Sequence, residues 1–211
     1  MQERQSEQSE ALGRRMEWGL AFMDDYFEGK SAVHSAAREL AQRLDAAGIE
    51  YVIAGALALN AHGYMRATVD VDVILTREGL ERFKSEWLGR GYVNLRPGGK
   101  PVRDTINNVQ IDFLLAGDFP GDGRPKPVAI PAPAEVAVRA GAYQVVSLRS
   151  LIELKLASGM SAPHRGKDLV DVQELIHRTR IPRDFVEQLN PYVHTKFLDV
   201  WELAQHPDDE Y

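Results

Sequence analysis

Residues 54–75 decide the fold, and they read AGALALNAHGYMRATVDVDVIL. The stretch follows a short apolar run, Tyr51–Ala54, and Gly55 opens an alanine-rich segment that ends at Gly63. A short apolar run bounded by glycine favours a strand, whereas an alanine- and leucine-rich segment closed by glycine is typical of a helix. The first half of the stretch therefore predicts a strand, a glycine turn and a short helix.

The second half, Thr68–Leu75, predicts a strand on which Asp70 and Asp72 share one face. Polar and β-branched residues alternate there, and side chains two apart in a strand point the same way, with Cα atoms roughly 6.5 to 7 Å apart. Two carboxylates so placed can hold one or two Mg²⁺ ions, which clamp the attacking and leaving oxygens of a displacement. The competing interpretation is the solvated face of an edge strand.

Asp112 supplies a third acid, because it interrupts another apolar strand pattern, Val109–Leu115. Aspartate is depleted in strands, so acids within such runs favour a functional role. Three carboxylates converging on one face would repel one another, and a bound cation would relieve that repulsion. We expect Asp70, Asp72 and Asp112 to bind metal if their two strands are neighbours in one sheet.

The other candidate residues suit phosphate oxygens. The Gly55–Ala56 turn would present the N–H groups of a helix N-terminus, although an ordinary strand-to-helix turn has the same sequence. Arg66, close to Thr68, can bind a phosphate or pair with either strand acid. Lys155 lies in an apolar helical pattern and either reaches a triphosphate or extends to solvent. His62 is interpreted as a packed or capping histidine rather than a general base.

These residues resemble the nucleotidyltransferase superfamily with the polymerase-β-like fold, and within it the abortive-infection, toxin-type branch. Residues 54–72 are similar to that branch's glycine motif, His-Gly, Arg-x-Thr and Asp-x-Asp, in order and at matching spacing. Asp112 falls where the family's third acid is expected. The segment Ser147–Lys155, followed by Arg165–Asp168 and Asp171, is similar to the part after the family's core.

The resemblance implies an α+β fold, in which a small mixed β-sheet is flanked by helices, with a C-terminal helical portion. It also implies an enzyme that transfers a nucleoside monophosphate from an NTP to an acceptor and releases pyrophosphate, with Mg²⁺ or Mn²⁺ as cofactor. The acceptor would be a protein, a tRNA or a small molecule. The catalytic and metal-binding residues would be Asp70, Asp72 and Asp112, and the nucleotide-binding residues would be Gly55, Ala56, Arg66, Thr68 and Lys155.

Ala56 departs from the family pattern, in which a second Gly or a Ser usually follows the first glycine. A hydroxyl contact to phosphate is lost from that position, whereas backbone N–H donation survives. The alternative function is therefore a catalytically silent nucleotide- or partner-binding module of the same fold. Such a module would act with a cognate partner protein in a toxin–antitoxin or phage-defence pair.

The chain divides into four parts. Glycine stops predict N-terminal helices in 1–48, followed by an α/β core in 49–146. Ser147 stands where a helix N-cap would, so 147–206 is expected to be helical, and 207–211 forms an acidic tail. Within these parts the patterns predict helices at 77–89, 148–159 and 167–178, and two more that begin near Pro182 and Pro191. They predict a strand at 91–95, and edge strands at 128–130 and within 135–146. A loop is expected at 117–127.

Composition narrows the classes of function. The chain has 211 residues, no cysteine and a formal net charge of -6, so disulfides, thiolate metal sites and an extended basic nucleic-acid surface are not expected. No apolar stretch approaches the roughly 18 residues of a membrane span, and the polar N-terminus has no secretion signal pattern. We therefore expect a cytoplasmic protein without a membrane partner.

Overall fold

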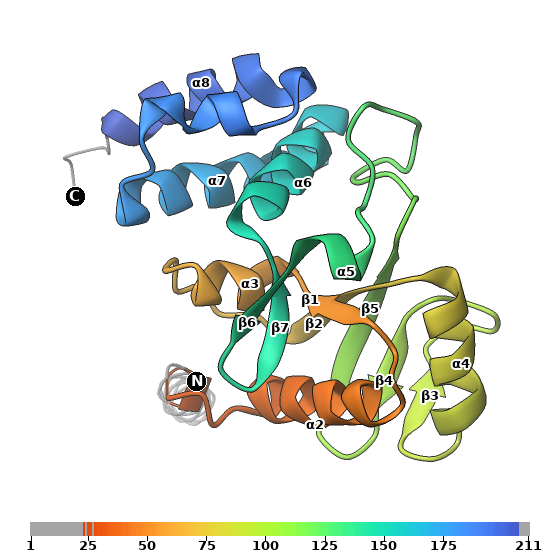
Figure 1. Ribbon diagram of the computed structural model, residues 1–211. Helices are drawn as coiled ribbons and strands as arrows, with labels where there is room; N and C mark the ends of the chain where they lie inside the picture. The colour runs from red at the N-terminus through yellow and green to blue at the C-terminus, as the bar shows by residue number, and fades with distance from the viewer. Residues whose placement is uncertain (1–22, 24, 27, 207–211) are drawn as a thin grey trace, which may run out of the picture.

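The computed structural model of the protein describes residues 23, 25–26 and 28–206. Its centre is a seven-stranded mixed sheet with the order β3-β4-β5-β2-β1-β7-β6 (Figure 1). The strands are β1 (Tyr51–Ile53), β2 (Asp70–Leu75), β3 (Tyr92–Asn94), β4 (Val102–Asp104), β5 (Val109–Leu115), β6 (Ala137–Ala140) and β7 (Tyr143–Val146). The helices are α2 (Ala32–Ala46), α3 (Gly55–Ala61), α4 (Arg77–Trp87), α5 (Pro133–Val136), α6 (Leu148–Ser161), α7 (Gly166–Thr179) and α8 (His194–Gln205), and the 3₁₀ turns are η1 (Pro163–Arg165), η2 (Arg183–Gln188) and η3 (Pro191–Val193).

Strands β2 and β5 form the parallel pair at the middle of the sheet. Strand β1 pairs antiparallel with β2 on one side and parallel with β7 on the other. Alternate residues of β5 and of the first half of β2 are buried, as the period of two in their sequences predicts, and the last three residues of β2 are all buried. Val71, Val73, Ile111 and Phe113 belong to this buried set, so the remaining polar positions face the other way.

Helices α2 and α4 help to bury the apolar side chains of the sheet. Phe83 of α4 contacts the ring of Phe113, with centroids 5.1 Å apart. The guanidinium of Arg43 in α2 lies over the ring of Tyr92, which in turn contacts Phe83. These aromatic contacts and the buried apolar stripe of α2 anchor the sheet from which the acids project.

The C-terminal helices α6, α7 and α8 pack on one another above the sheet in Figure 1. Ser147 caps α6 by accepting a hydrogen bond from the backbone N–H of Ser150, as its position predicts. The indole N–H of Trp201 in α8 donates to the carbonyl of Ile181, which ties α8 to the segment after α7. The expected class, a mixed sheet flanked by helices with a C-terminal helical portion, is confirmed.

Two expectations about strands need correction, and one strand has no counterpart among them. Residues 128–130 form no strand, and within 135–146 β6 lies at the sheet edge as expected, whereas β7 lies inside the sheet. Strand β4 is the one without a predicted counterpart. Strand β4 has three residues and follows Pro101, so it is too short for a periodic signal. Strand β7 gains its inner place from the pairing of Ile53 with Val145, which no local pattern reveals.

Two other expectations have simpler outcomes. The first expected N-terminal helix and the acidic tail lie almost wholly outside the described residues. The second expected helix is α2, which Gly48 follows with a positive φ of 63°. Within residues 23, 25–26 and 28–206, no helix is both long and apolar enough to cross a membrane.

Candidate active site

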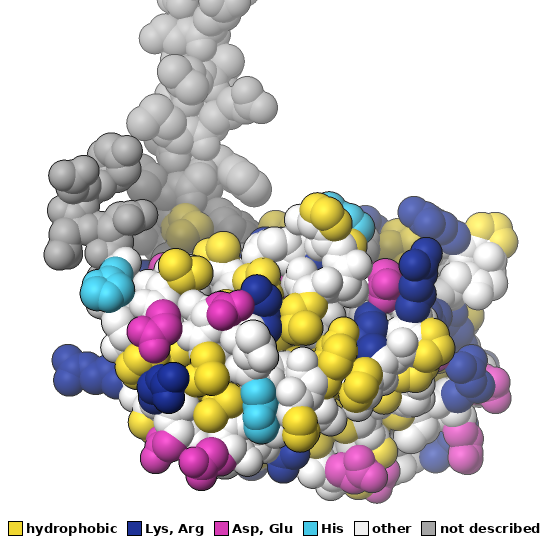
Figure 2. Space-filling view, turned by 90° about the horizontal axis from the view of Figure 1, so that it is seen from above, with side chains coloured by type: hydrophobic (Ala, Val, Ile, Leu, Met, Phe, Trp, Pro, Cys, Tyr) yellow, Lys and Arg dark blue, Asp and Glu magenta, His cyan; other side chains and the backbone are white. Residues whose placement is uncertain are grey.

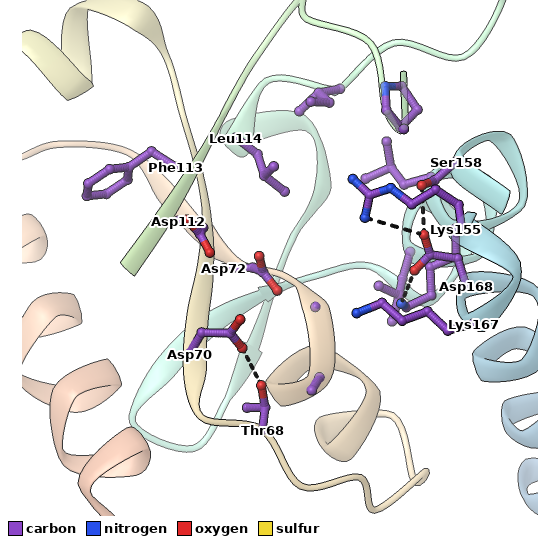
Figure 3. Close-up of a pocket in the computed structure, with 18 of the residues that line it drawn as sticks. Thr68, Asp70, Asp72, Asp112, Phe113, Leu114, Lys155, Ser158, Lys167 and Asp168 are labelled. Atoms are coloured by element: carbon purple, nitrogen blue, oxygen red, sulfur yellow. Dashed lines mark hydrogen bonds and ion pairs between the residues drawn. The ribbon is translucent and has the colours of Figure 1, made fainter. Parts of the chain in front are cut away.

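The three predicted acids lie side by side on one face of the β2–β5 pair. Asp72 is the register partner of Asp112, and Asp70 is the partner of Gln110. Residues directly opposite each other in a sheet share a face, and residues two apart along a strand share it as well. The neighbouring strands that the three-acid hypothesis requires are therefore present, and the Asp112 carboxylate is on the same side as the other two (Figure 3).

Two of the carboxylates accept hydrogen bonds from their own strand segments. The Thr68 hydroxyl donates to Asp70 Oδ1, and the amide of Gln110 donates to both oxygens of Asp112, at 3.1 and 2.9 Å. In the described residues, no group of three or more His, Cys, Asp or Glu side chains is arranged as it stands to hold a metal ion. A metal bound by all three acids would require their side chains to turn toward one another.

Asp72 lies between the other two acids and is the most perturbed. Burial, and after it the charges of Asp70 and Asp112, together raise the pKa of its carboxyl from 3.8 to about 6, against the opposing effect of Lys155 and Lys167. A carboxylate in this position is short of positive charge. The site therefore favours a cation, or a proton, at Asp72.

Gly55 makes room for Asp72 as well as for a ligand. Its φ of +58° is in the left-handed region, and a Cβ on Gly55 would overlap the Asp72 carboxylate, lying 2.8 Å from Asp72 Cγ. Helix α3 begins at this residue, and the backbone N–H of Ala54 donates to the Asp72 carbonyl at 2.8 Å. The glycine turn is thus in direct contact with the acid strand.

Helices α6 and α7 form the opposite wall, with a buried ion-pair network. Lys155 Nζ donates to Asp171 Oδ2 at 2.6 Å and to Asp168 Oδ1 at 3.2 Å, and the hydroxyl of Ser158 donates to Asp168 Oδ2 at 2.7 Å. Lys155, Asp168 and Asp171 are each more than 90% buried. Lys155 therefore neither extends to solvent nor reaches out freely, because the two carboxylates hold its ammonium group.

Arg66 also pairs with an acid that was not expected. Its Nη1 lies 3.1 Å from Asp171 Oδ2, the same oxygen that Lys155 contacts, rather than against Asp70 or Asp72. The backbone of Arg66 is fixed at both ends, because its N–H donates to the Asn60 side chain and its carbonyl accepts from the Tyr26 hydroxyl, at 2.7 and 3.0 Å. The segment that carries Arg66 is held firmly at the site.

All eight predicted site residues line one cavity of about 450 Å³. The cavity lies between the acid face of the sheet and the α6–α7 wall (Figure 3). The side chain of Lys167 points across it toward the acids, and Lys155 and Asp168 stand behind. The predicted residues in its lining are Gly55, Ala56, Arg66, Thr68, Asp70, Asp72, Asp112 and Lys155.

Two lining residues, Lys100 and Ser158, were not predicted as site residues, and they come from the turn before β4 and from α6. Arg165, Lys167 and Asp168 also line the cavity, and they belong to the segment after the core that the sequence analysis singled out. A helical spacing of three places Ser158 on the same side of α6 as Lys155, so this residue had a signal in the sequence. Lys100 had none, because only the tertiary fold brings its turn to the cavity.

His62 lies outside the chemistry of the cavity. Its Nε2 is 2.7 Å from the Val146 carbonyl, which joins the end of α3 to β7. The packed-histidine interpretation fits this contact.

No protein-family model matches the sequence, and no curated protein matches it either. Among solved structures, the chain is similar to the antibiotic-resistance factor ANT(2″)-Ia in solution, with 16% identity over 78% of this chain and 92% of that chain, and a TM-score of 0.48. It is also similar to ANT(2″)-Ia in a crystal complex with adenylyl-2″-tobramycin, with 16% identity over 74% and 91% of the chains, and a TM-score of 0.47. These values describe a partial similarity of the backbone fold.

Proposed function

We propose that this chain is a divalent-metal-dependent nucleotidyltransferase, which transfers a nucleoside monophosphate from an NTP to an acceptor hydroxyl. The observation that carries the proposal is the arrangement of Asp70, Asp72 and Asp112 on one sheet face, across a cavity from the cations of α6 and α7. A metal-bound triphosphate has the complementary distribution of charge, since its cations need carboxylates and its outer oxygens need cationic donors.

The residues at the acid face fit Mg²⁺ or Mn²⁺. The available ligands are carboxylate oxygens, which hard divalent cations prefer, and no cysteine exists in the chain. Burial, and after it the charges of Asp70 and Asp112, raises the pKa of Asp72, and a bound cation would offset both effects by favouring the charged carboxylate. When bound, the cations would supply charge neutralisation on the phosphate oxygens and orient the triphosphate.

In the proposed reaction, the acceptor oxygen forms a bond to the α-phosphorus while the bond from that phosphorus to the bridging oxygen breaks. Pyrophosphate leaves with the electron pair of the broken bond, and the acceptor proton passes to the Asp112 carboxylate. Gly55 and Ala56 border the triphosphate with backbone N–H groups, and Thr68 orients Asp70. Lys155 of α6, and Arg66 from the segment before β2, also line the cavity and share Asp171.

The finer assignments follow from the resemblance rather than from the site. Under them the protein belongs to the abortive-infection, toxin-type branch, meets its NTP in the cytoplasm, and acts with a cognate partner protein in a toxin–antitoxin or phage-defence pair. The acceptor is a protein, a tRNA or a small molecule.

A transfer assay with the full chain tests the proposal. Each of the four NTPs, labelled on the α-phosphate, is incubated with Mg²⁺ or Mn²⁺ and with tRNA, cell-extract protein or a panel of small hydroxyl compounds. We expect label on one acceptor class, equal release of pyrophosphate, and loss of both in Asp72→Asn. The matched control is Asp199→Asn, which removes an exposed carboxylate of α8 outside the cavity. Absence of transfer with every NTP and acceptor would contradict the proposal.

A second candidate, the catalytically silent module, is favoured by one observation. Asp70 and Asp112 are turned to Thr68 and Gln110, and the three acids are not gathered around a common point. Calorimetry separates the candidates, because a silent module would bind NTP without turnover and with little dependence on Asp70→Asn or Asp72→Asn. The enzyme requires metal-dependent NTP binding that both substitutions abolish.

A further inference from the structure

A second cavity of about 600 Å³ adjoins the candidate active site. Its outer wall is the loop that follows β5, with Asp118, Phe119 and Asp122 among the lining residues. The two cavities are neighbours, because they have six lining residues in common. These are Lys100, Leu114, Pro120, Gly121, Ile130 and Arg165.

Strand β5 runs from the acid site to this second cavity. Asp112 lines the first cavity, Leu114 lines both, and Gly117 and Asp118 line the second. Asp112 and Leu114 are two apart in one strand, so they face the same side. A molecule in the second cavity would therefore reach the reaction centre from the Asp112 side, as an acceptor must if Asp112 takes its proton.

The loop that follows β5 is held in place by packing and by hydrogen bonds. A Cβ on Gly121 would lie 3.0 Å from the carbonyl oxygen of Ser158, so the loop backbone packs directly on α6. The N–H of Asp122 donates to the Ser161 hydroxyl at 3.2 Å, and Ile130 donates to the carbonyl of Asp118 at 2.8 Å. The second cavity consequently has fixed boundaries on the helix side and the strand side.

The junction between the cavities carries two cationic side chains. Lys100 Nζ lies 2.9 Å from Asp118 Oδ2, but Asp118 also has Arg77 at 3.7 Å, so its charge stays compensated if Lys100 turns to a ligand. Arg165 lies 4.0 Å from Asp168, whose carboxylate is already engaged by Lys155 and Ser158. Figure 2, which looks down on the molecule of Figure 1, shows several Lys and Arg side chains on the right, the side on which both this loop and α4 lie in Figure 1.

We infer that the second cavity is the acceptor subsite and that it takes a hydroxyl compound bearing a phosphate group, bound between Lys100 and Arg165. The role of this cavity as an acceptor subsite rests on the proposed function, whereas phosphate binding can be measured without any transfer. Two cations beside the apolar lining of Leu114, Phe119 and Ile130 select a phosphorylated ligand over a neutral one. An RNA end and a phosphorylated small molecule present the same chemistry, and the probes below distinguish them.

The binding experiment uses the full chain with EDTA and three probes: ribose 5-phosphate, ribose and a short single-stranded RNA. We expect the phosphorylated probes to bind and ribose not to bind. Lys100→Gln and Arg165→Gln should each weaken binding about tenfold, the loss expected for one charge-assisted contact. Asp118→Asn should strengthen the binding of the phosphorylated probes, because the Asp118 carboxylate no longer competes with their phosphate for Lys100. Arg183→Gln, which removes an exposed arginine that lines neither cavity, is the matched control and should change nothing.

The two sources of phosphate give different results, each of which supports the inference. If RNA is the ligand, affinity falls with salt, and the double variant at Lys100 and Arg165 reduces the log–log slope by about 1.4, or 0.7 for each lost contact. If a small molecule is the ligand, ribose 5-phosphate binds as well as RNA does. Equal binding of ribose and ribose 5-phosphate, or no effect of Arg165→Gln, would overturn the inference.

A competition arm separates this inference from the proposed function. A saturating nonhydrolysable NTP with Mg²⁺ must leave the phosphorylated probe bound, since the acceptor and the NTP occupy different cavities. Displacement would mean that Lys100 and Arg165 belong to the triphosphate site, and the inference would fail. If probe binding follows the charges while no NTP is ever turned over, the phosphate subsite stands and the acceptor role falls with the proposed function.

Discussion

The Asp72 carboxylate lies directly over Gly55, where any other residue would place its Cβ. The glycine that opens α3 and the acid at the centre of the site therefore depend on each other for space. The sequence suggests that Gly55 gives a ligand close access, and the structure adds that it gives Asp72 its position.

Gly55→Ala is expected to destabilise the protein by more than the backbone strain alone. A left-handed residue with a Cβ costs roughly 1–2 kcal/mol, and the overlap with Asp72 adds to that cost. Gly48→Ala is the matched control, because Gly48 has a φ of +63° and nothing within 4 Å of the added carbon. Urea denaturation should give a larger loss for Gly55→Ala, partly restored in the double variant with Asp72→Ala. Equal losses at the two glycines would show that Asp72 moves aside freely.

The raised pKa of Asp72 predicts how stability depends on pH without metal. Between about pH 4 and 6 the folded state binds more protons at Asp72 than the unfolded state, so the free energy of unfolding falls as pH rises through this window. A shift from 3.8 to about 6 corresponds to a loss of roughly 3 kcal/mol, complete above pH 6.

Asp72→Asn should remove this dependence. In EDTA at pH 7.5 the variant should be more stable than the parent, and at pH 4 the two should be nearly equal. Thermal melts of the parent and of Asp72→Asn across this range measure the difference between their stabilities. The contributions of the other acids are common to both proteins, so they cancel in that difference. A parent protein that gains stability relative to Asp72→Asn as pH rises would contradict the prediction.

The sequence predicted the inner strands better than the contacts of the site. Strand β5 matches its expected bounds, and the period of two correctly assigned Asp70 and Asp72 to one face, because that assignment depends only on neighbours along the chain. The pairing of Arg66 and Lys155 with Asp171 depends on how α6 and α7 pack against the segment before β2. No local pattern records that packing. Lys100 shows the same limit, since its turn reaches the cavity only through β4.

Asp112→Asn should weaken metal binding without weakening the fold. The substitution keeps a polar side chain beside Gln110 and removes one of the charges that raise the pKa of Asp72. We expect Mn²⁺ affinity to fall about tenfold or more, and stability in EDTA to be unchanged or slightly higher. Calorimetric Mn²⁺ titration and urea denaturation measure the two effects.

Asp104→Ala is the contrasting variant for this test. Asp104 is buried at the end of β4, where it accepts hydrogen bonds from the N–H of Ile106 and the side chain of Asn107. Its loss should reduce stability and leave the Mn²⁺ affinity of the folded protein intact. Unchanged Mn²⁺ binding in Asp112→Asn would exclude Asp112 as a ligand.

Lys155 and Lys167 should separate stability from ligand binding, although both line the cavity. Lys155 is buried between Asp168 and Asp171, so Lys155→Met leaves two carboxylates without their main partner and should cost about 3–5 kcal/mol. Lys167 is exposed and points toward the acids, so Lys167→Met should change stability by less than about 0.5 kcal/mol. It should nevertheless weaken the binding of a nonhydrolysable NTP with Mg²⁺ roughly tenfold, through the loss of one cationic contact. Urea denaturation and calorimetry on the same preparations measure the free energy of unfolding and the NTP affinity. A Lys155→Met protein as stable as the parent would show that Asp168 and Asp171 lose their ion pairs with Lys155 at little cost.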